Sequence, residues 1–178
     1  PLRSSPDNLT LYHDYHRANI DAFQTAKVRS SPELSENYTI AVGLLRGFIE
    51  GHLLASQVFD IKRMAGFIAS AHFWRSWHGI RWGNLRFYYN PMTTHLEPIA
   101  FDTDTNFRFD TSSIEEPIIK RMLEDPVLYA AYRQAMETLM AYVDDGSLAA
   151  QLRPVEDAQL RLLLPSSRFV KPFDYRAF

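Results

Sequence analysis

The chain has 178 residues, of which 46% are hydrophobic and 22% are charged, a composition typical of a globular domain with a core. Its net charge of −2 argues against a nucleic-acid-binding surface or a polybasic membrane patch. The absence of cysteine excludes disulfides and cysteine-bound zinc, and no apolar run is long enough to span a bilayer. The chain begins at Pro1, from which we expect it to be a portion of a longer protein.

Three helices are predicted in the first half of the chain, over residues 9–29, 33–56 and 61–77. Each follows a side chain that can accept hydrogen bonds from a helix N-terminus: Asn8, Ser31 and Asp60. Apolar residues at helical spacing in 61–77 predict that this third helix is largely buried, and Gly79 is expected to end it in a left-handed conformation. Three glycines four residues apart in the second helix indicate either a phosphate-binding loop or a stripe for close packing; the lack of GxGxxG or Walker spacing favours packing.

A β-hairpin is predicted next, with strands at 85–89 and 96–101 joined by the turn 90–95, whose Asn-Pro sequence favours a turn. Alternation places Leu85, Phe87 and Tyr89 on one face of the hairpin and Arg86 and Tyr88 on the other. Residues 103–113 are expected to form a loop, and helices are predicted over 115–124, 126–144 and 147–163, the last kinked or restarted at Pro154. Residues 165–178 are expected to be an extended tail. The fold class is therefore mainly α (α+β), a helical bundle-like lobe with one embedded β-hairpin.

Polar side chains flank this hairpin at its open end. Asn84 directly precedes the first strand, and Asp102 follows the second. Because the two strands of a hairpin are antiparallel, these residues lie at the same end of it. An amide and a carboxylate oxygen side by side are suitable ligands for a divalent cation and the phosphate that it accompanies.

The order of residues around this hairpin resembles that of the CotH family, which is named for a bacterial spore-coat protein and has an atypical protein-kinase-like fold. The resemblance covers residues 40–145 and is strongest over 72–104. It rests on Trp77-His78-Gly79 at a helix end, on Trp82-Gly83-Asn84-Leu85-Arg86-Phe87-Tyr88-Tyr89-Asn90-Pro91, and on Leu96-Glu97-Pro98-Ile99-Ala100-Phe101-Asp102. It implies that residues 1–178 form a single domain or the larger, helical C-terminal lobe of a longer CotH-like domain, with an N-terminal lobe upstream.

The resemblance also implies a site that uses Mg²⁺ or Mn²⁺ and ATP to phosphorylate a protein Ser/Thr hydroxyl. Asp102 matches the family's metal-binding aspartate and Asn84 a second metal ligand, while Asp104 could add an oxygen. Arg86 could bind a phosphate or hold Asp102. CotH kinases usually carry an aspartate as catalytic base near the end of the preceding helix, whereas this chain has no carboxylate between Asp60 and Glu97. His78 could take that role at neutral pH.

Two other readings of the same residues stay open. The missing carboxylate near His78 also fits a pseudokinase or structural module of a coat or cell-surface assembly. A third interpretation is a helical interaction domain in which the tryptophans form core. No phosphate-binding lysine or glycine-rich strand pair is found, so an active kinase needs these parts from an upstream lobe. The compartment is not fixed by the sequence, although the resemblance is compatible with a cell-surface or coat location.

Overall fold

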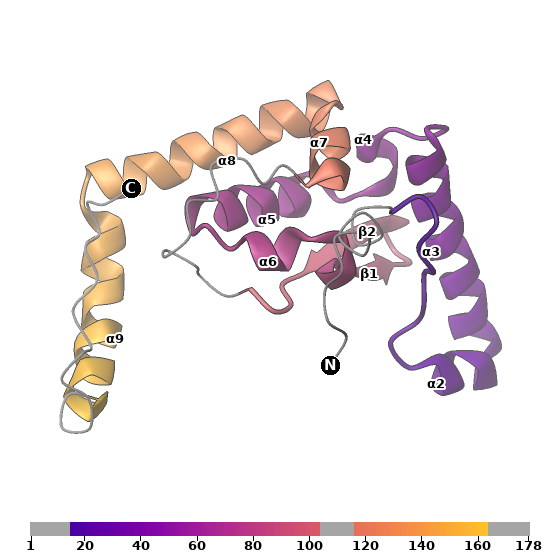
Figure 1. Cartoon of the computed structure of the whole chain (residues 1–178), viewed down its shortest axis with the longest axis horizontal. Coiled ribbons are helices and arrows are strands. Elements are labelled where there is room, and N and C mark those ends of the chain that lie inside the picture. The colour runs from indigo at the N-terminus through magenta and orange to yellow at the C-terminus, as the bar shows by residue number, and fades with distance from the viewer. Residues whose placement is uncertain (1–14, 104–115, 164–178) are drawn as a thin grey trace, which may run out of the picture.

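The computed structural model describes residues 15–103 and 116–163 (Figure 1). In chain order its elements are α2 Thr25–Ser30, α3 Pro32–Glu50, α4 Ala55–Val58, α5 Ile61–Phe73, α6 Trp77–Ile80, the short 3-10 helix η1 Trp82–Asn84, β1 Arg86–Asn90, β2 His95–Ile99, α7 Pro117–Leu123, α8 Pro126–Asp144 and α9 Ser147–Leu163. The predicted class, mainly helical with one antiparallel hairpin, is confirmed for these residues.

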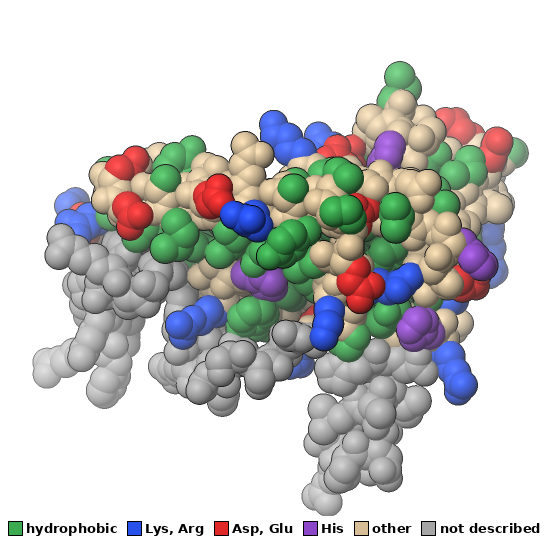
Figure 2. Space-filling view, turned by 90° about the horizontal axis from the view of Figure 1, so that it is seen from above, with side chains coloured by type: hydrophobic (Ala, Val, Ile, Leu, Met, Phe, Trp, Pro, Cys, Tyr) green, Lys and Arg blue, Asp and Glu red, His purple; other side chains and the backbone are tan. Residues whose placement is uncertain are grey.

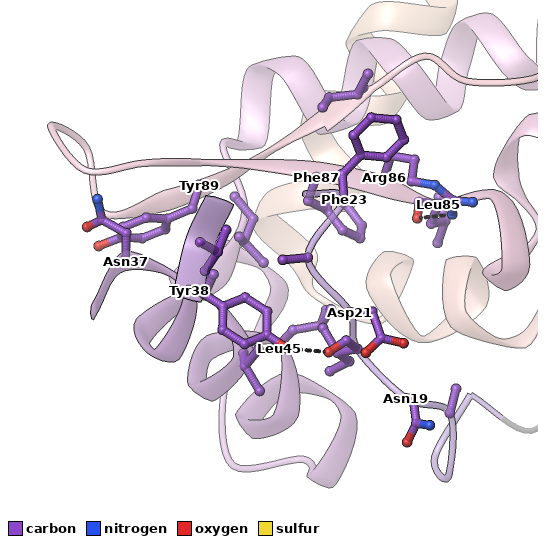
Figure 3. Close-up of a pocket in the computed structure, with 18 of the residues that line it drawn as sticks. Asn19, Asp21, Phe23, Asn37, Tyr38, Leu45, Leu85, Arg86, Phe87 and Tyr89 are labelled. Carbon is purple, nitrogen blue, oxygen red and sulfur yellow. Dashed lines mark hydrogen bonds between the residues drawn. The ribbon is translucent and has the colours of Figure 1, made fainter. Parts of the chain in front are cut away.

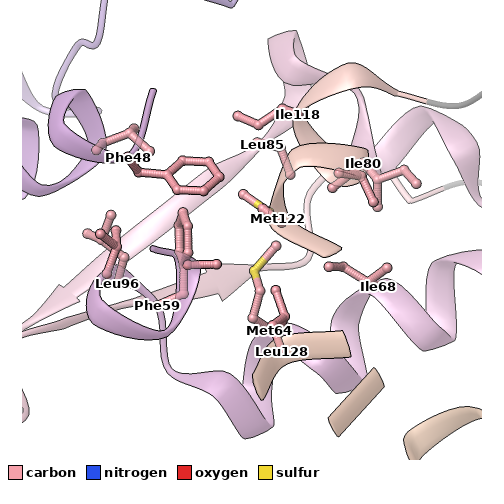
Figure 4. Packing of buried hydrophobic residues seen from close by; sticks show 14 of the residues in the cluster. Phe48, Phe59, Met64, Ile68, Ile80, Leu85, Leu96, Ile118, Met122 and Leu128 are labelled. Atoms are coloured by element: carbon pink, nitrogen blue, oxygen red, sulfur yellow. The ribbon is translucent and has the colours of Figure 1, made fainter. Parts of the chain in front are cut away.

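The hydrophobic core lies between α5, α8, α7 and the hairpin. Helix α5 runs beside α8 and contacts both α6 and β2, so that most of its surface is covered, as its sequence predicts. The largest fully buried side chains come from α3 to α8 and from the residue that follows α4: Phe48, Val58, Phe59, Met64, Ile68, Ile80, Ile118, Met122 and Leu128. Most of them converge in one cluster (Figure 4). The core therefore anchors the helix before the hairpin and the helices after it to one another.

The hairpin is fixed to the start of α5. Its register pairs Arg86 with Ile99 and Asn90 with His95, and the backbone N–H of Asp60 donates to the carbonyl oxygen of Leu96 at 2.9 Å. Arg63 and Glu97 form an ion pair between α5 and β2. These contacts hold the hairpin rigidly on the helical body, which fixes the position of its open end.

The alternation predicted for the hairpin is confirmed. Phe87 and Tyr89 pack against the core and Leu85 is buried, whereas the Tyr88 side chain is 53% exposed. The face with Phe87 therefore points into the molecule, as expected for a strand with one buried side.

Residues 9–14 of the predicted helix 9–29 lie outside the described residues. The prediction is wrong over residues 15–24, which contain turns and bends, and the helix begins at Thr25. Arg46 of α3 donates to the carbonyl oxygens of His16 and Ala18, at 3.0 and 2.6 Å. The Tyr38 hydroxyl donates to the Ile20 carbonyl oxygen at 2.6 Å. Side chains of α3 therefore take up carbonyl groups that a helix would have satisfied internally.

The second predicted helix ends earlier than expected, at Glu50. Gly51 adopts a left-handed conformation with φ 85°, and its N–H donates to the carbonyls of the preceding turn. A Cβ atom on Gly47 would lie 2.8 Å from the Leu53 side chain, because the chain folds back against α3 after the cap. Gly47 and Gly51 thus allow a tight return of the chain rather than contact with a second helix, and no atom lies within 4 Å of a Cβ added at Gly43.

The third predicted helix also ends early, at Phe73, and the prediction for Gly79 is wrong. Arg75 has φ 52°, and the N–H of Ser76 donates to the carbonyl oxygen of Ala71 at 2.8 Å, a Schellman-type helix end. A separate short helix, α6, then contains His78 and Gly79. This break turns the chain so that α6 faces the hairpin end.

The last two helices match the sequence-based bounds. Helix α8 covers Pro126–Asp144, as predicted, and begins with Asp125 as its cap. Helix α9 runs through Pro154 without a restart there, and it projects from the body (Figure 1). Basic, acidic and apolar side chains are interspersed over the face seen from above (Figure 2). Among the described residues, none of the helices combines the length and apolarity that crossing a bilayer requires. The predicted tail 165–178 and most of the loop 103–113 lie outside the described residues.

Candidate functional site

Three of the predicted site residues meet at the open end of the hairpin. His78 lies in α6, Asn84 ends η1, and Asp102 follows β2. The Nε2 atom of His78 lies 2.9 Å from Oδ2 of Asp102, and the Asn84 side-chain amide donates to the His78 backbone carbonyl at 3.0 Å. The hairpin thus brings together an imidazole, a carboxylate and an amide, as its flanking residues predict.

The pair formed by His78 and Asp102 is open to solvent, since their side chains are 45% and 53% exposed. An exposed ion pair contributes little to folding stability, typically ~0–1 kcal/mol. The hydrogen bond instead fixes the orientation of the imidazole, because a carboxylate that binds one ring nitrogen favours the proton on that nitrogen. With Nε2 bonded to Asp102, Nδ1 is the ring nitrogen left to exchange a proton.

The backbone reaches this arrangement through two features that the sequence does not signal. Asp102 has φ 50°, a left-handed conformation that aspartate tolerates better than most residues. The chain then passes so close to α6 that a Cβ atom on Gly79 would lie 2.5 Å from Cγ2 of Thr103 and 3.3 Å from its Cα. Gly79 therefore allows the segment with Asp102 to lie against the helix that carries His78.

Arg86 has a different role from the expected contact with Asp102. It donates hydrogen bonds to the carbonyl oxygens of Gly83 and Leu85, both at 2.9 Å, and its guanidinium carbon lies 4.8 Å from the centre of the Phe101 ring. Arg86 thereby connects the residues that precede β1 with Phe101, which follows β2 and directly precedes Asp102. Asp104, the other predicted ligand, lies outside the described residues.

The oxygen atoms of Asp102 and Asn84 are too few to bind a cation by themselves, but they suit a cation that is also bound by phosphate. Among the described residues, no group of three or more His, Cys, Asp or Glu side chains could hold a metal ion. Asp102 keeps its second carboxylate oxygen, and the Asn84 amide, which donates through nitrogen, keeps its oxygen as an acceptor. Mg²⁺ is commonly bound through one or two carboxylates, with phosphate oxygens and waters completing its shell.

His72 and the tryptophans belong to the core side of this region. His72 Nδ1 lies 2.8 Å from the Tyr132 hydroxyl, its ring centre lies 5.0 Å from that of Trp77, and burial lowers its pKa. Trp77 and Trp82 pack against the buried cluster. These contacts fix α6 and η1 on the core, and they agree with the interpretation of the tryptophans as core residues.

Beside this site lies a cavity that the sequence analysis did not anticipate. It is lined by residues 18–23, helix α3 and the hairpin, and Arg86 and Leu85 lie on the hairpin side of it (Figure 3). The strand alternation could have indicated that Phe87 and Tyr89 face inward. The extended course of residues 18–23, which forms the opposite wall, carries no local signal because it depends on contacts with α3.

Comparisons of the chain with known protein families, with curated proteins and with solved structures find no match.

Proposed function

We propose that this chain is the helical lobe of a CotH-like phosphoryl-transfer domain, which binds Mg²⁺–ATP at the open end of the hairpin and modifies a protein Ser/Thr hydroxyl. The observation that carries the proposal is the meeting of three residues: His78 Nε2 lies 2.9 Å from Asp102 Oδ2, and Asn84 is bonded to the His78 carbonyl. Asp102 and Asn84 are the residues that the resemblance implies for metal binding, and His78 lies where the family usually carries a catalytic aspartate.

Each residue has a task that its surroundings permit. The free oxygens of Asp102 and Asn84 would hold the cation, which when bound neutralises charge on the transferring phosphoryl group. His78, oriented by Asp102, would accept the proton of the attacking hydroxyl at Nδ1, since an imidazole is a suitable base near neutral pH. Arg86, anchored to Gly83 and Leu85, would keep the two ends of the hairpin together while substrates bind.

A second candidate is a pseudokinase or structural module of the same family. It is favoured by the absence, among the described residues, of a third metal-ligating side chain near Asp102. It is also favoured by the hydrogen bond that already engages one Asp102 oxygen with His78. In that case the His78–Asp102 pair would serve only to fix the segment after β2 on α6.

Calorimetry of ATP binding with Mg²⁺ and with Mn²⁺, on the full-length natural protein, tests the proposal. Asp102→Asn keeps the shape of the side chain and removes its charge, so we expect it to abolish metal-dependent binding without unfolding the domain. Asp144→Asn at the exposed end of α8 is the matched control and should bind as the natural protein does. Binding without phosphoryl transfer to any protein hydroxyl would favour the pseudokinase, and no binding at millimolar nucleotide would refute the nucleotide site.

A further inference from the structure

The cavity beside the hairpin has the size and lining of a small-molecule site. Its volume is about 940 Å³, within the range of roughly 300–1,000 Å³ that is usual for pockets binding organic ligands. Aromatic side chains line much of it: Tyr38, Trp82, Phe87, Tyr89 and Phe101. Such rings favour a ligand with a flat or extended apolar body, because each buries a large area at little cost in side-chain entropy.

The walls of the cavity are fixed by hydrogen bonds before any ligand binds. Arg46 of α3 donates to the His16 and Ala18 carbonyls, and Tyr38 donates to the Ile20 carbonyl. These bonds fix residues 16–20 against α3. The opposite wall is formed by the hairpin, with Phe87 on its inner face and Arg86 at the start of β1. Arg63 and Glu97 tie the hairpin to α5. The cavity is therefore a preformed feature of the fold.

Among the described residues that line the cavity, Arg86 is the cation. Arg86 uses NH1 for the two backbone carbonyls and places its guanidinium over Phe101, so its orientation is fixed. In the described ranges 15–103 and 116–163, no carboxylate forms an ion pair with it. Asp21 is the acidic residue of the lining, and it lies on the facing segment 18–23. A guanidinium group with a fixed orientation and free N–H donors is suited to bind a carboxylate, because the two groups can form a pair of hydrogen bonds.

We propose that this cavity binds an apolar carboxylate, with the hydrocarbon body against the aromatic lining and the carboxylate at Arg86. The ligand is either a fatty acid or an aromatic acid, which share this chemistry. The inference does not depend on the phosphoryl-transfer function, because Asp102 and His78 do not line the cavity.

A pair of fluorescent probes tests the proposal on the full chain. Anilinonaphthalene sulfonate is an apolar anion, and phenylnaphthylamine is its uncharged parent, so the two differ only at the group that Arg86 would bind. We expect both to bind with enhanced emission. Arg86→Met, which keeps an apolar side chain of similar length, should weaken binding of the anion about tenfold, the usual loss for a charge-assisted hydrogen bond. It should leave the uncharged probe unchanged, and Lys62→Met on α5 should change neither.

Displacement then identifies the ligand class. Dodecanoate should displace the anionic probe if the ligand is a fatty acid, and naphthoate if it is aromatic, while dodecanol should compete at least tenfold more weakly than dodecanoate. Ala41→Phe fills the cavity and should abolish binding of both probes. Asp102→Asn should leave the binding of both probes intact, even where it abolishes Mg²⁺–ATP binding. Equal affinity of the anion for the natural protein and Arg86→Met, in chains with the same melting temperature, would overturn the proposal.

Discussion

Replacing Gly79 by alanine should separate Asp102 from His78. Gly79 is buried in α6, and an added Cβ would lie 2.5 Å from Cγ2 of Thr103 and 3.3 Å from its Cα. Carbon atoms in contact are usually about 3.5–4.0 Å apart, so the distance between the added Cβ and Thr103 must increase by roughly 1 Å. Rotation of the Thr103 side chain would relieve only the contact with the methyl group, because the backbone Cα is also too close.

The Thr103 segment is the part that should move, since residues 100–103 are exposed whereas α6 packs on the core. A displacement of about 1 Å would lengthen the 2.9 Å separation of His78 Nε2 and Asp102 Oδ2 beyond hydrogen-bonding distance. We expect a cost of about 1 kcal/mol in the free energy of unfolding, at the low end of the ~1–3 kcal/mol usual for overpacking, because an exposed segment can give way.

Nitrogen NMR of the His78 ring reports this directly, because the hydrogen bond to Asp102 favours the Nε2–H tautomer. Gly79→Ala should shift the ring toward the tautomer mixture of a free imidazole, and it should weaken metal-dependent ATP binding. Gly43→Ala is the matched control: no atom lies within 4 Å of its added Cβ, so helix propensity should stabilise the protein by up to ~1 kcal/mol. An unchanged His78 tautomer together with increased stability in Gly79→Ala would refute this reasoning.

Three further predictions concern stability, measured by urea denaturation. Asp125 is 3% exposed and accepts hydrogen bonds from the N–H groups of Ser56 and Val127, at 2.7 and 2.9 Å; Asp125→Ala should therefore cost about 3 kcal/mol. Burial alone would raise the pKa of Asp125, but these hydrogen bonds outweigh it and hold the pKa below 3.8. Their contribution to the free energy of unfolding should therefore be present above about pH 4 and be lost at lower pH. Asp125→Asn should make the dependence of this free energy on pH flatter. Burial lowers the pKa of His72 below 6.5, so as the pH falls the unfolded chain takes up a proton before the folded protein does. The free energy of unfolding should therefore fall as the pH drops below about 6.5. His72→Gln should remove this dependence, and an unchanged dependence on pH in the variant would contradict this explanation. Arg63→Met should cost about 1 kcal/mol by breaking the ion pair with Glu97, a smaller loss than that of Asp125→Ala.

Elements delimited by local signals could be predicted from the sequence. Helix α8 begins at Asp125-Pro126 and ends before Gly146, because a capping carboxylate, a proline and a left-handed glycine act within a few residues. The hairpin likewise follows from its alternation and its turn. Its antiparallel strands then bring Asn84 and Asp102 to one end, so the composition of the site could be predicted as well.

Features that depend on distant contacts could not be predicted. Residues 15–24 have the composition of a helix, but Arg46 and Tyr38 of α3 bind the carbonyls of His16, Ala18 and Ile20. The break after Phe73 depends on a left-handed arginine, Arg75, where the sequence offers no glycine. The pairing of His78 with Asp102 requires both the left-handed backbone of Asp102 and the close approach of Thr103 to Gly79.

The most direct test of the central claim is the location of a bound cation–nucleotide complex by NMR. Mn²⁺ added in small amounts with ATP to the full-length protein broadens resonances of nearby residues. We expect selective broadening of His78, Asn84 and residues 100–103, which Asp102→Asn should remove and Asp144→Asn should leave in place. Broadening that is uniform over the surface, or that persists around other carboxylates in Asp102→Asn, would show that the open end of the hairpin is not a nucleotide site.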